Sequence, residues 1–153
     1  KQLEVSGASG VALFNRFYQP DIDLGTLEVL PKLELSTSSE TLLRIRWAAL
    51  LYGRTALSLA VTGGFHDTGD VLKALLAGAD VVHLCSVLLK QGVGQLTQLL
   101  VELEQWLVEH EYDSISQLKG SVSQQHAIDP AKYERANYVE VLDNYSCPSG
   151  VLR

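Results

Sequence analysis

The sequence is poor in the residues that mark disulfide-rich and metal-binding proteins. It has no methionine and only two cysteines, Cys85 and Cys147, which form no CxxC pair and no disulfide framework. This cysteine usage favours a reducing, cytoplasmic setting. The four histidines show no spacing typical of metal ligands, so we assign no metal site.

Long hydrophobic runs and basic clusters are missing as well. No apolar run is long enough to span a bilayer, and the N-terminal segment lacks the hydrophobic region of a signal peptide. The net charge of −6 and the lack of a Lys/Arg cluster argue against nucleic-acid binding. We therefore expect neither a membrane nor a nucleic acid as a partner.

What the sequence does contain is the pattern of an α/β domain. Its 153 residues are 46% hydrophobic and 20% charged, which suffices for one domain with a core. Three short apolar runs, Val11–Phe14, Ala56–Val61 and Val81–Cys85, suit strands buried on both faces. Residues 1–7 resemble a last helical turn closed by Gly7. Because the chain starts in such a turn and has no methionine, we expect a fragment or a truncated product.

A helix is expected after each of these strands. The first begins near Ser38 with the spacing of a capping box and ends at Gly53. The second is capped by Asp67 or Thr68 and ends at Gly78. Strand, helix and strand at this spacing predict a parallel sheet with right-handed crossovers.

Further elements are expected outside these units. Phe17–Asp23 is assigned to an aromatic and acidic loop, and Leu33–Leu35 is a candidate for a short extra strand. Residues 146–153 are assigned to a flexible tail. Helices are expected at Val87–Lys90, Gln95–His110, Ser114–Gly120 and Asp129–Tyr145.

The clearest chemical signal lies where two of the strands end. The run Ala56–Val61 leads into Gly63 and Gly64, and the next run ends at Cys85 and Ser86. Small residues at adjacent strand ends let backbone N–H groups approach a phosphate. The same glycines also suit a simple strand-to-loop turn, and Cys85 suits a small buried residue. The residues alone leave both interpretations open.

Polar residues near these strand ends have two interpretations each. Asn15 suits an Asx turn, but its place at the end of a strand also suits a functional side chain. His66 follows the glycines, where it is either inert or in contact with an anion. Arg16, Asp21 and Asp23 either meet a substrate or form surface ion pairs, which contribute little to stability.

Three parallel strands make an incomplete sheet, because both of its edges would be unpaired and apolar. The pattern therefore predicts part of a larger fold. We assign the chain to the α/β class, as a partial (β/α)8 barrel with additional C-terminal helices that spans residues 1–145.

The chain resembles the C-terminal part of the class 1 dihydroorotate dehydrogenases and their dihydroorotate dehydrogenase-like relatives, which are FMN-binding (β/α)8 barrels. The matching segments are Gly10–Asp23, Leu35–Glu40, Thr62–Phe65, Leu75–Asp80 and Ile128–Tyr138. The resemblance implies that the three apolar runs are barrel strands six, seven and eight.

The resemblance also implies a cofactor and a set of site residues. The family places the phosphate of FMN at the loops after strands seven and eight, in agreement with the general rule for barrel phosphate sites. The implied cofactor-binding residues are Gly63, Gly64, Cys85, Ser86 and Ser36, and Asn15 is implied to contact the substrate.

The implied activity is the oxidation of dihydroorotate or a related dihydropyrimidine, a small-molecule step of pyrimidine metabolism. The segments that carry the catalytic Cys or Ser base and the flavin-contacting Lys in the family are absent from this sequence, so we assign no catalytic residue. The chain is expected to form a homo-oligomer or to pair with the N-terminal half of the barrel. The alternative is a non-catalytic half-barrel that binds phosphate or associates with itself.

Overall fold

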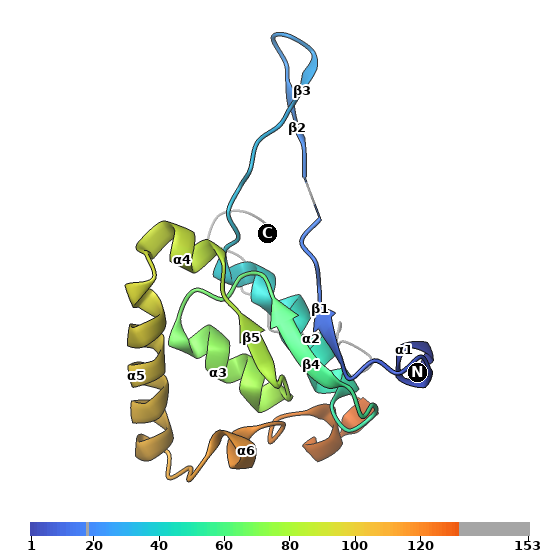
Figure 1. The fold of residues 1–153 in the computed structure, drawn as a ribbon, viewed down its shortest axis with the longest axis vertical. Coiled ribbons are helices and arrows are strands. Elements are labelled where there is room, and N and C mark those ends of the chain that lie inside the picture. Colours follow the sequence, from blue (N-terminus) through green and yellow to red (C-terminus); the bar gives the residue numbers. More distant parts are fainter. Residues whose placement is uncertain (18, 132–153) are drawn as a thin grey trace, which may run out of the picture.

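The structure is a computed structural model that describes residues 1–17 and 19–131. Its centre is a parallel sheet of three strands, β1 (Gly10–Leu13), β4 (Ser58–Thr62) and β5 (Val81–His83), in the order β1-β4-β5 (Figure 1). Leu13 lies beside Val61, and Val61 lies beside Val82. The expected strands and their parallel pairing are confirmed, but the expected burial on both faces is wrong, since several residues of β1 and β5 are exposed.

Two helices form the crossovers between these strands. The first is α2 (Thr41–Leu51), which follows a 3-10 turn, η1 (Ser38–Glu40), and the second is α3 (Thr68–Ala77). Both expected starts are confirmed, since a capping box precedes α2 and the carboxylate of Asp67 accepts the Asp70 N–H at 2.8 Å before α3. Gly78 ends α3 with a φ of +114°, which only glycine adopts without strain.

Both helices pack on the same face of the sheet. Val61 is fully buried in one cluster with Ala48 and Ala49 of α2 and Ala74 of α3. In Figure 1 the strands lie in front of α2 and α3, and the opposite face has no cover from another described element. Accordingly, Val81 remains 45% exposed. Parallel sheets are usually covered on both faces, so the arrangement in the described residues is incomplete.

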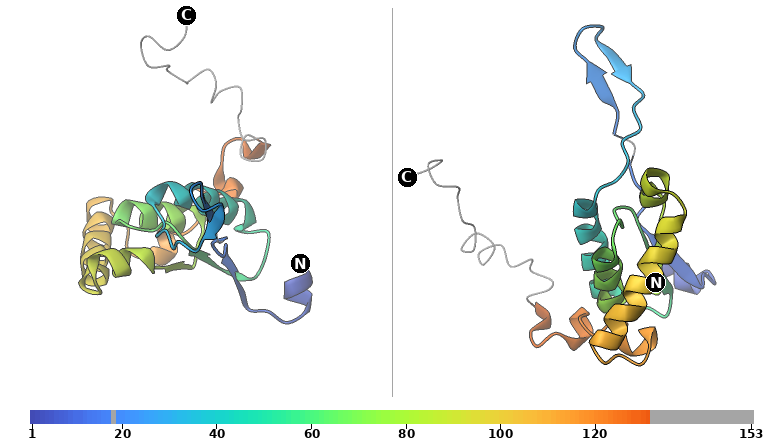
Figure 2. Two further views of the ribbon diagram at one scale, coloured as in Figure 1. Left: turned by 90° about the horizontal axis from the view of Figure 1, so that it is seen from above. Right: turned by 90° about the vertical axis from the view of Figure 1, so that its left-hand side faces the viewer.

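Most of the remaining helical elements pack around α3, on the side away from α2. The first is α4 (Ser86–Gln91), and it leads into α5 (Gly94–Glu109), which packs with α6 (Ile115–Leu118) against α3 (Figure 2). The other helical elements are a 3-10 turn, η2 (Gln124–His126), and the N-terminal α1 (Gln2–Val5). These positions confirm the expected helices. The expected helix up to Tyr145 and the tail 146–153 lie largely outside the described residues.

Two expectations for the segment after β1 are wrong. Residues assigned to a loop contain β2 (Asp21–Asp23), which pairs antiparallel with β3 (Glu28–Leu30) in a hairpin that projects from the body (Figures 1 and 2). The carboxylate of Asp23 accepts the N–H groups of Gly25 at 2.7 Å and Thr26 at 3.0 Å, which shapes the turn. The candidate strand Leu33–Leu35 has no strand partner among the described residues.

The chain is thus a mixed α/β protein with a small parallel sheet and several helices. The described residues do not form a closed barrel, because β1 and β5 each pair only with β4. In the part of the chain that the structure describes, no helix combines the length and apolar character needed to cross a membrane.

Candidate functional site

A cavity of about 210 Å³ lies at the carboxyl ends of β4 and β5. We call it the strand-end cavity. Its wall contains every residue that the sequence analysis assigned to cofactor binding, namely Ser36, Gly63, Gly64, Cys85 and Ser86. Parallel strands end at one edge of a sheet, so the loops that follow them meet there. The structure therefore brings these residues together from three separate loops.

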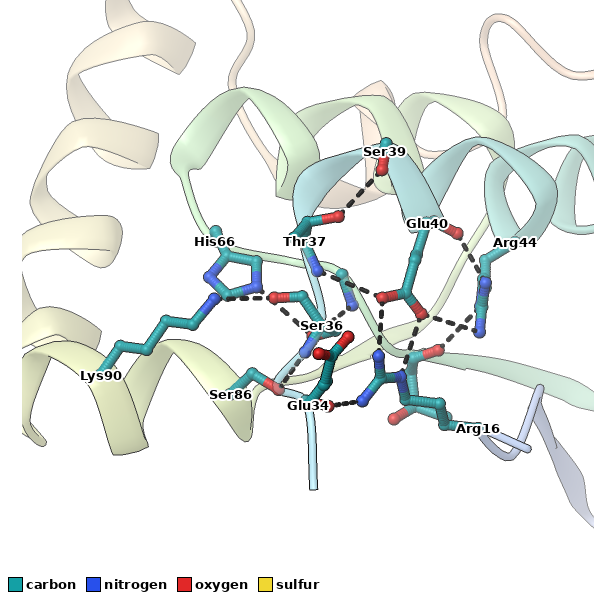
Figure 3. A network of polar contacts seen from close by, with 12 residues as sticks. Arg16, Glu34, Ser36, Thr37, Ser39, Glu40, Arg44, His66, Ser86 and Lys90 are labelled. Carbon is teal, nitrogen blue, oxygen red and sulfur yellow. Dashed lines mark hydrogen bonds and ion pairs between the residues drawn. The ribbon is translucent and has the colours of Figure 1, made fainter. Parts of the chain in front are cut away.

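Ser36 holds the three loops in contact. Its N–H donates to Ser86 Oγ at 3.1 Å, its Oγ accepts the Gly64 N–H at 3.2 Å, and its carbonyl oxygen accepts from Lys90 Nζ at 2.9 Å (Figure 3). Ser36 is only 3% exposed. We call this set of bonds the Ser36 junction. Through these bonds, the backbone and the side chain of Ser36 together hold the wall of the cavity in place.

His66 lies against the same hydroxyl. Its Nε2 is 3.3 Å from Ser36 Oγ, and its backbone N–H donates to Asp70 Oδ2 at 3.1 Å. The buried Asp70 also accepts from Ser38 Oγ at 2.7 Å. A carboxylate that orients a catalytic histidine bonds to the imidazole ring, whereas Asp70 bonds the backbone. Asp70 therefore supports the backbone of the loop that carries His66.

Local packing explains why two glycines follow β4. Gly63 and Gly64 have φ values of +93° and +96°, a region that disfavours every other residue. A Cβ on Gly64 would lie 2.8 Å from the carbonyl oxygen of Thr37 and 2.9 Å from the backbone nitrogen of Thr41. Because the Gly64 N–H already donates to Ser36, only part of the expected backbone surface is available to a phosphate.

The carboxyl end of the sheet carries more cations than carboxylates. Glu40 accepts hydrogen bonds from Arg16 at 3.2 and 3.3 Å, and its Oε2 lies 3.9 Å from Arg44 Nη2. Arg16 and Arg44 thus face the single carboxylate of Glu40, which leaves a surplus of one positive charge there. Lys90, which bonds the Ser36 carbonyl, is matched by the buried carboxylate of Asp70 beside His66. The charge at this end of the sheet is therefore positive, although the net charge of the whole sequence is −6. Such a surplus favours an anion.

The opposite charges of a second ion pair near this end of the sheet neutralise one another. The Lys32 ammonium lies 2.8 Å from Glu34 Oε1 and, by this hydrogen bond and its charge, lowers the pKa of the Glu34 carboxyl. Glu34 is therefore ionised at neutral pH and is matched by Lys32. The pair leaves the surplus around Glu40 unchanged.

The structure places Asn15 apart from the other expected site residues. Asn15 lines a second hollow of about 610 Å³, the Asn15 hollow, together with Phe14, Leu43 and Trp47. The rings of Phe14 and Trp47 meet edge to face with centroids 6.2 Å apart. Arg16 is the residue that lines both this hollow and the strand-end cavity. The substrate role expected for Asn15 is neither supported nor opposed by this placement.

Sequence reasoning missed two residues of the site. Arg44 is 9% exposed and donates from Nε to the Thr62 carbonyl at 3.2 Å and from Nη1 to the Glu40 carbonyl at 2.7 Å. Lys90 reaches the Ser36 junction from the last turn of α4. Arg44 sits within an apolar helix and Lys90 within a short helix after β5, so no local pattern marks either residue.

The fold and the site define an α/β protein with a small parallel sheet and a cavity at the carboxyl ends of its strands, which Arg16 lines. Among the described residues, no group of three or more His, Cys, Asp or Glu side chains is placed to hold a metal ion. A comparison with known protein families finds none that matches this chain, and a search of curated proteins finds no significant relative.

Proposed function

We propose that the chain is the cofactor-phosphate part of an FMN-dependent oxidoreductase of the dihydroorotate dehydrogenase-like family. In this proposal the enzyme oxidises dihydroorotate or a related dihydropyrimidine. The observation that carries the proposal is the strand-end cavity, in which Ser36, Gly63, Gly64, Cys85 and Ser86 share one wall.

The topology of the sheet supports a place within a (β/α)8 barrel. The strand order β1-β4-β5 follows the chain order, and both crossover helices lie on one face. A doubly wound sheet instead reverses its strand order and covers both faces with helices. A sheet wound in one direction only, if continued, closes into a barrel whose inner face is the one left uncovered here. By the resemblance to the dihydroorotate dehydrogenase-like family, the proposed barrel strands six to eight are β1, β4 and β5.

The residues of the strand-end cavity suit the phosphate end of FMN. The cavity of about 210 Å³ is smaller than the pockets that enclose whole ligands of this size, so it would hold only one end of the cofactor. Small side chains at Cys85 and Ser86 and the surplus of positive charge around Glu40 favour a compact anion. Bound FMN would supply the acceptor for the hydride of the substrate. The catalytic base would come from residues outside this chain.

Thermal unfolding with two matched flavins tests this proposal. FMN is expected to raise the unfolding temperature of the full chain, since a ligand that binds only the folded state at about 100 times its Kd adds about 2.7 kcal/mol. Riboflavin, the same flavin without a phosphate, is expected to bind at least about tenfold more weakly and so to raise the unfolding temperature less at the same concentration. An unfolding temperature that ignores both flavins would contradict the proposal.

A substitution in the cavity makes the test specific. Ser86→Asp keeps an acceptor for the Ser36 N–H and adds a negative charge at the cavity wall. We expect it to abolish the FMN shift while the protein stays folded. Ser114→Asp is the matched control, because Ser114 caps α6 at the far end of the molecule and Asp caps helices equally well. This control is expected to keep the full FMN shift.

We further propose that another chain completes the sheet. Within the described residues, β1 and β5 have one strand neighbour each, and one face of the sheet is uncovered. Leu42, Leu43 and Trp47 of α2 are exposed beside β1. Open apolar edges of this kind pair readily with other strands. The partner is a second copy or the N-terminal half of the barrel, and a self-associating half-barrel without catalysis is the alternative function that these surfaces favour.

A further inference from the structure

Arg16 occupies a position that its contacts alone do not explain. It follows β1 and lines both the strand-end cavity and the Asn15 hollow. Its side chain remains about one-third exposed, at 32%. A guanidinium at the boundary of two cavities can meet a ligand that reaches from one into the other.

The guanidinium is held firmly in place by the protein. Its Nε and Nη2 donate to the two carboxylate oxygens of Glu40 at 3.2 and 3.3 Å, and its Nη1 donates to the Glu34 carbonyl oxygen (Figure 3). Each terminal nitrogen carries a second N–H. Among the described residues, no acceptor is found for these second N–H groups of Arg16, so the side chain is oriented but retains donors for a ligand.

The charge of Arg16 is only partly compensated. Its partner Glu40 also faces Arg44 and accepts the Thr37 N–H at 3.2 Å, so one carboxylate serves several donors. Because Arg44 is buried and fixed on the Thr62 carbonyl, Arg16 is the more accessible of the two cations. An anion that approaches this boundary would therefore meet Arg16 first.

The surroundings indicate what kind of anion fits. Leu33 and Leu35 line the strand-end cavity with Arg16, and aromatic side chains line the Asn15 hollow. Apolar walls beside a planar guanidinium suit a flat ring that carries a carboxylate, since arginine binds carboxylates with paired hydrogen bonds. A phosphate would instead go to the wall of small residues around Ser86.

We propose that Arg16 is the specificity-determining residue that binds the carboxylate of a ring-shaped substrate. This inference rests on the proposed function, because it assigns a recognition residue for the substrate class of that function. Arg16 then discriminates between pyrimidines with and without a carboxylate. The competing explanation is a purely structural ion pair that ties the loop after β1 to α2.

The test compares two ligands that differ only in the carboxylate. The probes are orotate, a planar pyrimidine carboxylate, and uracil, the same ring without it, titrated into the full chain and followed by NMR. We expect orotate to bind at least about tenfold more tightly than uracil, equivalent to about 1.4 kcal/mol. Arg16→Gln is expected to remove this preference. Arg16→Lys keeps the cation but loses the planar fork, and is expected to keep only a few-fold preference.

Each result decides between the two explanations. Lys32→Gln removes a nearby exposed cation that lies outside both cavities and is expected to leave the preference unchanged. Wild-type protein that does not bind orotate, or folded Arg16→Gln that retains the preference, overturns the inference. The flavin shift is measured on the same samples. If the wild-type protein shows the FMN shift but no preference for orotate, only the role of Arg16 is rejected. If it shows an orotate preference that depends on Arg16 but no FMN shift, only the cofactor proposal is rejected.

Discussion

Ser86 Oγ accepts the backbone N–H of Ser36 at 3.1 Å, and this bond joins loops that are 50 residues apart in the sequence. Around it the Ser36 junction connects the segments after β1, β4 and β5. Removal of this acceptor leaves a buried donor unpaired, which is more costly than the net gain of a typical hydrogen bond. The cavity wall is thus sensitive to single polar substitutions.

Ser86→Ala is expected to destabilise the protein by about 1–2 kcal/mol, because the buried Ser36 N–H loses its partner. Urea unfolding measures the change. Ser39→Ala is the control, since its hydroxyl bonds only the exposed side chain of Thr37 in the described contacts, and it is expected to stay within about 0.5 kcal/mol of the wild type. Equal losses in both variants would show that the junction has no special role.

Gly64→Ala is expected to cost about 3 kcal/mol or more, since strain at positive φ adds to a clash with Thr37 and Thr41. Gly7→Ala separates the two causes. Gly7 has a similar φ of +87°, but a Cβ there would meet no atom within 4 Å, so we expect only the strain of about 1–2 kcal/mol. Chemical denaturation of both variants checks the difference, and a smaller loss at Gly64 than at Gly7 would contradict the close packing.

Much of this fold follows from local sequence patterns, whereas the polar contacts of the site do not. The strands, the start of α2 and the cap of α3 at Asp67 depend on residues close in sequence, and each was predicted. The Ser36 junction depends on a loop that folds back over two strand ends distant in sequence. The spacing of apolar residues along the chain does not predict such contacts. The hairpin was missed because its turn depends on Asp23 and its strands have only three residues each.

Asp80 gives the stability a dependence on pH. Burial opposes ionisation of Asp80, but hydrogen bonds from Lys119 Nζ and from the Leu59 N–H outweigh it and lower the pKa of the carboxyl. A carboxyl whose pKa is lower in the folded state stabilises the protein above its unfolded pKa of about 4. That contribution is lost as the pH falls through the folded-state value.

We therefore expect the free energy of unfolding to decrease as the pH falls below about 4, and Asp80→Asn to reduce this slope. The variant is also expected to lose about 1 kcal/mol at pH 7, where the wild-type carboxylate is ionised. Denaturant titrations across the pH range measure both effects. Asp113→Asn, a substitution at an exposed carboxyl, is the control for general charge effects. An unchanged slope in Asp80→Asn would exclude this residue as the source.

Trp47 tests whether the open edge of the sheet at β1 is an interface. Trp47 of α2 is 41% exposed and lies against Phe14, which follows the edge strand β1. If a second chain packs there, Trp47→Lys introduces a charge into an apolar contact and is expected to shift an oligomer to a monomer in light scattering. Leu96→Lys, on α5 and 44% exposed, is the matched control and is expected to keep the assembly. A wild-type chain that is monomeric at high concentration would reject self-association. Binding of a separate chain through this surface would then be the surviving form of the proposal.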